Sequence, residues 1–195
     1  LKIDSSGNLI IATGGDLITN TLGGTTNLRL GVNAGDAIAD GALDNTLIGN
    51  NAGTTISVAD HNVAVGSAAL QSETKGSSNI AIGYAALNSS NTTSPAATYN
   101  TAVGVLSGLH ITTGVQNTLI GGDAGEFSTT ADNSTFVGFQ AGQGITGVKL
   151  TGNNNTAVGK SAGLLLQGAA TQNTFMGAFA ADAITVAQDN TAFGY

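Results

Sequence analysis

The chain has 195 residues, of which 29 are Gly, one is Pro and none is Cys, and only 9% are charged. Twelve acidic against five basic residues give a formal net charge of −7, which argues against nucleic acid or an anionic membrane surface as a partner. The absence of cysteine excludes disulfides and thiol chemistry. Hydrophobic residues reach 41%, too many for a disordered chain. No apolar run approaches the roughly 20 residues of a membrane-spanning helix, so we expect no membrane insertion.

Residues 1–26 do not follow the pattern of the remaining chain. Lys2-Ile3-Asp4, then Ser6-Gly7-Asn8, then residues 9–12 predict a strand, a turn and a second strand. We therefore predict a lead-in of short β-strands over 1–26 and a β-roll repeat array over 27–195. Because the last repeat stops in mid-motif at Tyr195, we interpret the array as a fragment of a longer fibre.

From residue 27 onward a nine-residue unit recurs, most clearly as Asn-Thr-Ala-Val-Gly-Lys-Ser-Ala-Gly over 155–163. Its fifth position is always Gly, and successive glycines lie 17 to 21 residues apart. A self-similar period of this length is typical of a solenoid in which each repeat forms one coil. An invariant Gly predicts a corner with positive φ or a close backbone approach. The corner glycines are Gly31, Gly49, Gly66, Gly83, Gly104, Gly121, Gly138, Gly159, Gly177 and Gly194.

The second to fourth positions of the unit predict a strand that is apolar on both faces. The second and fourth share one face and the third points the opposite way. A narrow coil covers only one of these faces from within, so the other needs a neighbouring chain. We interpret the fourth position as the monomer core, formed by Ile48, Val65, Ile82, Val103, Ile120, Val137, Val158, Met176 and Phe193. We interpret the third position as the face between protomers, formed by Leu47, Ala64, Ala81, Ala102, Leu119, Phe136, Ala157, Phe175 and Ala192.

The other positions predict turns, tight packing and a second strand. The opening Asn suits a side chain that bonds nearby backbone or its equivalents in adjacent coils, and the small eighth residue, Ala or Ser107, is expected to pack behind the corner. Alternating apolar residues in several connections, such as Ile56-Ser57-Val58, predict a second strand in each coil. We therefore expect an all-β parallel β-roll, or β-solenoid, of about ten coils. All length variation falls in the connections, the longest being 88–99 and 143–154, so we expect surface loops there.

The unit resembles the head repeats of trimeric autotransporter adhesins of the YadA type, in which a Ser-Val-Ala-Ile-Gly core recurs. It is more similar still to the Asn-Thr-Ala-hydrophobic-Gly repeats of phage tail fibres that end in an endosialidase-type intramolecular chaperone. The match covers about residues 27–195 and is most specific at 100–104 and 155–159. These coils are longer than those of the adhesin heads, and the 195 residues themselves contain no chaperone, stalk or anchor sequence. The resemblance implies a left-handed roll, a homotrimeric rod and attachment to a host surface receptor, glycan or protein.

The sequence offers little for catalysis, cofactor binding or metal binding, and we predict none of the three. His61 and His110 are the only histidines, both in connections, and a polar turn residue is the favoured role of His61. A Ca²⁺ ladder is an alternative role for the acids near the coil corners, although the Gly-Gly-x-Gly-x-Asp calcium repeat is absent. These acids are Asp36, Asp40, Asp44 and Asp60. A sugar-stacking patch is an alternative to burial for Phe136, Phe139, Phe175 and Phe179.

We therefore expect a non-enzymatic structural and attachment protein, extracellular and carried on a virion as a segment of a phage tail fibre. A bacterial surface adhesin or a self-assembling extracellular filament with the same rod is the alternative. A polysaccharide-degrading β-solenoid enzyme is less favoured, because no acidic pair recurs in the core unit.

Overall fold

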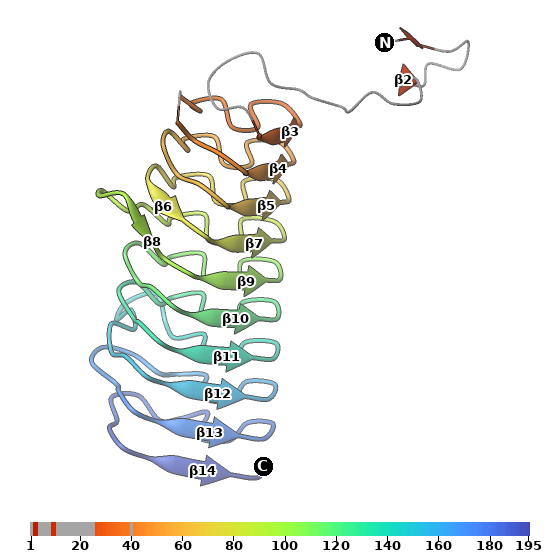
Figure 1. The fold of residues 1–195 in the computed structure, drawn as a ribbon. Coiled ribbons are helices and arrows are strands. Elements are labelled where there is room, and N and C mark those ends of the chain that lie inside the picture. Colours follow the sequence, from red (N-terminus) through yellow and green to blue (C-terminus); the bar gives the residue numbers. More distant parts are fainter. Residues whose placement is uncertain (1, 4–8, 11–25, 40) are drawn as a thin grey trace.

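The computed structural model describes residues 2–3, 9–10, 26–39 and 41–195. Ten short strands, one from each coil, form a single parallel sheet in which each strand lies beside the next along the chain (Figure 1). The strands are β3 (Leu28–Leu30), β4 (Thr46–Ile48), β5 (Val63–Val65), β7 (Ile80–Ile82), β9 (Thr101–Val103), β10 (Thr118–Ile120), β11 (Thr135–Val137), β12 (Thr156–Val158), β13 (Thr174–Met176) and β14 (Thr191–Phe193). The predicted all-β parallel solenoid of about ten coils is confirmed. Within the described ranges the chain forms no helix capable of crossing a membrane.

The register of the sheet follows the sequence repeat. Thr46 pairs with Val63, 17 residues later, and Ile80 with Thr101, 21 residues later. In every coil the strand consists of the second, third and fourth positions of the unit, whatever the length of the connection. The extra residues of the two longer coils lie in the connections 88–99 and 143–154, where surface loops are predicted. They leave the register of the sheet unchanged.

The predicted assignment of the two strand faces is wrong, because the structure reverses it. The third-position side chains lie inside the coil, where Leu47, Ala102 and Phe136 are fully buried within a single chain. The same holds for Ala64, Ala81, Leu119, Ala157 and Phe175, and Ala192 packs against this core. Such residues cannot contact a second protomer. The fourth-position residues assigned to the core face outward instead and are half-buried or exposed: Ile48, Val65, Ile82, Val103, Ile120, Val137, Val158, Met176 and Phe193.

The inward orientation of the third position follows from the turn of the coil that packs against the inner face of the strand. The coil turns back past the ninth position of the unit, and a Cβ built on Gly53 would lie 2.8 Å from both Leu47 Cδ2 and Ile56 Cδ1. The interior beside the strand is thus narrow, and in the nine coils after the first the third position holds Ala, Leu or Phe. Branched residues suit the broad outer face of a pleated sheet.

The predicted second strand of each coil is also wrong. Among the residues that the structure describes, only β6 (Gly76–Ser77) and β8 (Ala96–Ala97) form a second parallel pair, and isolated bridges such as that between Ser128 and Leu150 occur elsewhere. Ile56 turns into the core rather than joining a strand. Most connections are too short and too tightly turned to run extended beside their neighbours, so single backbone hydrogen bonds join them instead.

In the lead-in, β1 (Lys2–Ile3) and β2 (Leu9–Ile10) form an antiparallel pair, which confirms two short strands at these positions. The predicted turn at 6–8 lies outside the described residues. The division of the chain at residue 26 stays a prediction.

Candidate interaction surface

The corner glycines stack directly on one another along the rod. Gly49 has a φ of 137°, and a Cβ built on it would lie 2.5 Å from the carbonyl oxygen of Gly66 in the next coil. Gly159 stands in the same relation, also 2.5 Å, to the carbonyl oxygen of Gly177. A side chain at these positions would collide with backbone and would also require a strained φ. The corner therefore brings successive coils into the close contact that aligns their strands.

A ladder of buried Asn side chains fixes the start of each strand. The backbone N–H of Asn45 donates to Asn27 Oδ1 at 2.9 Å, and the backbone N–H of Asn62 donates to Asn45 Oδ1 at 2.9 Å. Asn45 Nδ2 also donates to the Ala59 carbonyl at 2.8 Å. Each side chain thus bonds the strand start of the next coil and the connection that leads to it. Sequence reasoning predicts this use of Asn, and Ser134 is the one position where a shorter side chain takes the place.

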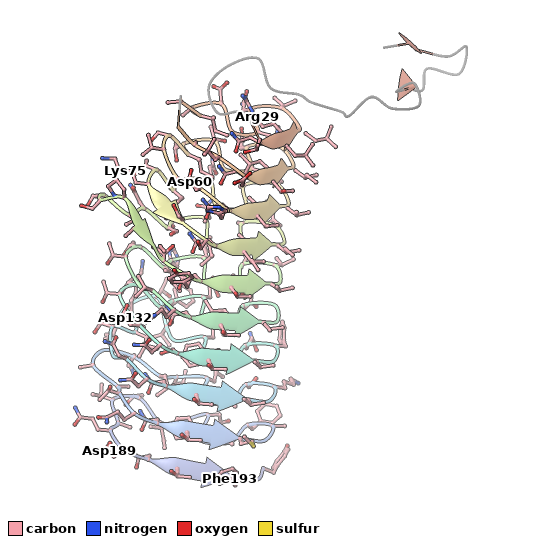
Figure 2. All side chains as sticks on the ribbon, in the orientation of Figure 1. Arg29, Asp60, Lys75, Asp132, Asp189 and Phe193 are labelled. Carbon is pink, nitrogen blue, oxygen red and sulfur yellow. The ribbon has the colours of Figure 1, made fainter. Side chains whose placement is uncertain are left out.

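The outer face of the ten-stranded sheet, formed by the second and fourth positions, is a continuous uncharged surface. Its residues are Thr, Val, Ile, Leu, Met and Phe, and Ile82, Ile120 and Met176 are 38–44% exposed in the single chain. Phe193 extends this face at the C-terminal coil (Figure 2). We call this surface the sheet face. No other element among the described residues covers it.

Apolar exposure continues around the corner from the sheet face. The residue directly after the corner glycine is Val32, Tyr84, Val105 or Phe139 in four coils, and these side chains are 51–67% exposed. We call these four residues the ridge. Sequence reasoning missed the ridge because the sixth position has no constant residue type: Asn50, Ser67 and Lys160 occupy it in other coils.

A buried carboxylate anchors the base of the long loop 88–99. Glu73 is fully buried, and its Oε1 accepts hydrogen bonds from four backbone N–H groups, including those of Gly76 at 2.7 Å and Thr92 at 3.0 Å. Its Oε2 accepts a 2.7 Å bond from Ser90 Oγ. Backbone donors around a carboxylate substitute for water and make burial of its charge tolerable. The rest of the loop, from Thr93 to Ala97, is exposed, and Glu73 fixes the base of the loop to the preceding coil.

The two histidines lie in separate places. His61 Nε2 is 3.5 Å from Asp44 Oδ2 on an exposed edge of the rod, consistent with a polar turn residue. His110 stacks on Phe127 with ring centroids 5.2 Å apart. Partial burial and the nearby Lys149 lower the pKa of His110, and Glu126 opposes this shift. The predicted turn role therefore fits His61, while His110 belongs to a half-buried aromatic pair.

Of the candidate calcium ligands, Asp36 is exposed, and Asp60 and Asp44 contact neighbouring coils. Asp60 Oδ1 accepts the Leu43 amide N–H at 2.8 Å, and Asp44 faces His61. Asp40 lies outside the described residues. Within the described ranges no three His, Asp or Glu side chains gather as a metal site would require, and no pocket opens.

The four phenylalanines do not form one patch. Phe136 and Phe175 fill the interiors of their coils. Phe139 belongs to the ridge, and Phe179 is half-buried with Lys160 Nζ 5.0 Å from its ring centroid. The separation between inner and outer rings excludes a stacking surface made of all four.

Comparison with protein-family models, with curated proteins and with solved structures gives no match to this chain.

Proposed function

We propose that the chain is a segment of an extracellular attachment fibre built from three parallel copies, akin to a phage tail fibre. The observation that carries this proposal is the uncovered apolar sheet face. Soluble monomers rarely expose apolar patches larger than a few hundred Å² unless the patch binds something.

The size of the sheet face supports a partner along its whole length. Ten strands spaced by about 4.8 Å give a face about 43 Å long, and three residues per strand give a width of about 10 Å. These dimensions give about 430 Å², about half of the roughly 800 Å² that each partner contributes to a stable interface, and the ridge extends the face further. The second and fourth positions that form the sheet face carry no charged residue, so no salt bridge between these positions directs the contact. A second copy fits such a face, because its coils repeat at the same spacing.

In this fibre the rod is the scaffold and the loops make the attachment. The connections 88–99 and 143–154 lie outside the ten-stranded sheet, and residues 93–97 and 146–148 within them are exposed. These loops are the surfaces proposed to meet a host receptor, glycan or protein. A cellular adhesin or filament would use the same rod and differ in the surface that carries it.

Light scattering of the purified segment, with electron micrographs for shape, tests the assembly. We expect a mass near three chains and a short rod. Ile120→Glu, on the sheet face, should convert the rod to folded single chains. Val186→Glu, at an exposed position in a connection, is the matched control and should leave the mass unchanged. A single-chain mass for the unaltered segment would contradict the proposal.

Binding of the labelled segment to a panel of intact bacterial strains tests attachment. Loss of binding on deletion of 93–96, with the mass unchanged, would support the loop as the contact. Cleavage of surface polysaccharide by the segment would instead favour a solenoid enzyme.

A further inference from the structure

We propose that neighbouring copies meet edge to edge, with the ridge of one copy packed against the strand starts of the next and with Val105 facing the Tyr99 of that copy. This inference rests on the proposed assembly around one axis and specifies which surfaces form the joint.

The first argument is that the exposed apolar surface does not end at the edge of the sheet. Val32, Tyr84, Val105 and Phe139 carry it past the corner glycines, and each is more exposed than Ile82 or Ile120 on the face itself. Two rods laid flat, sheet face on sheet face, would cover the strands and leave the ridge in water. A partner that meets the sheet at an angle covers both surfaces.

The second argument is the direction of the strands. They run across the rod, and all ten are parallel (Figure 1). When copies are arranged around a common axis parallel to the rod, every strand points the same way around the ring. The end of each strand then meets the start of the equivalent strand in the next copy, which is a heterologous contact that closes on itself. The ridge lies just after the strand ends, so its neighbour is the column of residues that precedes each opening Asn.

The third argument is that the two columns match in polarity at three successive or nearby levels of the rod. The strand-start column contains one large aromatic residue among polar ones: Asp44, His61, Ser78, Tyr99, Gln116, Asn133, Asn154, Gln172 and Asp189. Tyr99 is 58% exposed and belongs to the same coil as Val105, with Tyr84 one coil before. In the coils that begin with Asp44 and His61, the ridge position is the polar Asn50 or Ser67. Apolar meets apolar, and polar meets polar, at these three levels, whereas Tyr84 and Phe139 would meet the polar Ser78 and Asn133.

The absence of cysteine from the chain makes a direct test simple. In one chain, Tyr99 and Val105 flank the two ends of β9, separated by about 10 Å of strand, which is beyond the reach of a disulfide. In the double variant Tyr99→Cys/Val105→Cys, any disulfide between these sites therefore joins two chains. Under mild oxidation we expect more than half of the protein to run as covalent dimer and trimer on a denaturing, non-reducing gel.

The controls separate the possible arrangements. Each single variant should remain monomeric on the gel, because in a ring neither edge meets its own copy. Tyr99→Cys paired with Thr113→Cys, exposed in the connection of the same coil, should not crosslink either. Dimers from Val105→Cys alone would indicate a two-fold contact and overturn the inference. A trimeric mass without crosslinks in the double variant would overturn it too and leave the proposed fibre intact, whereas a single-chain mass would remove both.

Discussion

Ser90 Oγ donates a 2.7 Å hydrogen bond to Glu73 Oε2 inside the solenoid, at the level where Ile56 and Ile111 fill the coils on either side. In these two consecutive coils a polar residue replaces the apolar core residue, and each polar side chain is the hydrogen-bond partner of the other. The same carboxylate holds the backbone at Gly76 and Thr92, so the polar pair lies where the first long loop leaves the rod.

Removing the Glu73 carboxylate should destabilise the protein strongly. Glu73→Ala leaves buried N–H groups without an acceptor and should lower the free energy of unfolding by about 3 kcal/mol. Glu73→Gln keeps one acceptor oxygen and should cost about 1 kcal/mol. Denaturant titration followed by circular dichroism measures both. Glu126→Gln, on a half-buried carboxylate that accepts from Gln143 Nε2, is the control and should change stability by less than about 0.5 kcal/mol. Equal losses for Glu73→Ala and Glu126→Gln would show that the buried network contributes nothing.

Adjacent residues on one strand should respond oppositely to a charge. Ala157→Glu places a carboxylate inside a closed coil and should unfold the protein, with a loss above about 4 kcal/mol. Val158→Glu places the same group on the sheet face and should leave the coil folded while preventing assembly. Circular dichroism and light scattering distinguish the two. A folded, unassembled Ala157→Glu beside a trimeric Val158→Glu would restore the opposite assignment of the faces.

Glycine should be required at the corners and dispensable in the loops. Gly104 has a φ of 144°, and an added Cβ would meet the carbonyl oxygen of Gly121. Gly104→Ala should therefore lower stability by about 2–4 kcal/mol. Gly147, in the second long loop, has no atom within 4 Å of its would-be Cβ, and Gly147→Ala should be neutral to within about 0.5 kcal/mol. Thermal melting of both variants measures the contrast, and a tolerated Gly104→Ala would mean that the corners relax.

Completing the Asn ladder should stabilise the rod. Ser134 accepts the Asn155 amide N–H at 3.3 Å, a longer bond than the 2.9 Å found where Asn117 accepts from Ser134. Ser134→Asn supplies a longer side chain with two N–H donors in place of one O–H and should raise stability by about 1 kcal/mol. Asn117→Ala removes a buried acceptor and should lower stability by about 2 kcal/mol. Unfolding in denaturant measures both, and destabilisation by Ser134→Asn would show that this coil has no room for the amide.

The loop 88–99 should tolerate shortening only beyond its anchor. Deletion of 93–96 removes exposed residues, of which only Ala96 belongs to a strand (β8), and should shift the melting temperature by no more than about 3 °C, since loop closure depends weakly on length. Deletion of 89–92 is of equal size but removes Ser90 and Thr92, two partners of Glu73, and should be far more damaging. Similar melting temperatures for the two deletions would contradict the anchor.

The period, the strand positions and the corner glycines could all be predicted from the amino-acid sequence, because each depends on local chemistry repeated in every coil. A run such as Thr118-Leu119-Ile120 predicts a strand, and Gly121 after it predicts a corner. The repeat also indicated two apolar faces, and hence the need for a cover. Glu73, by contrast, resembles an ordinary surface acid, and its only signal was that it and Ser90 occupy, in consecutive coils, a position where most other coils carry Ile or Leu.

The face of the strand that turns inward could not be predicted in this way, because it depends on how the coil closes. Leu119 and Ile120 are both apolar, and alternation alone does not distinguish them. Closure of the coil decides, because Gly125 returns against Leu119, where an added Cβ would lie 2.8 Å from Leu119 Cδ2. The space inside admits Ala, Leu or Phe only as the neighbouring coils allow, and Ile120 remains outside. Which side chains share a closed interior is a property of the path of the backbone, and that path is fixed by contacts between coils rather than by the order of residues within one.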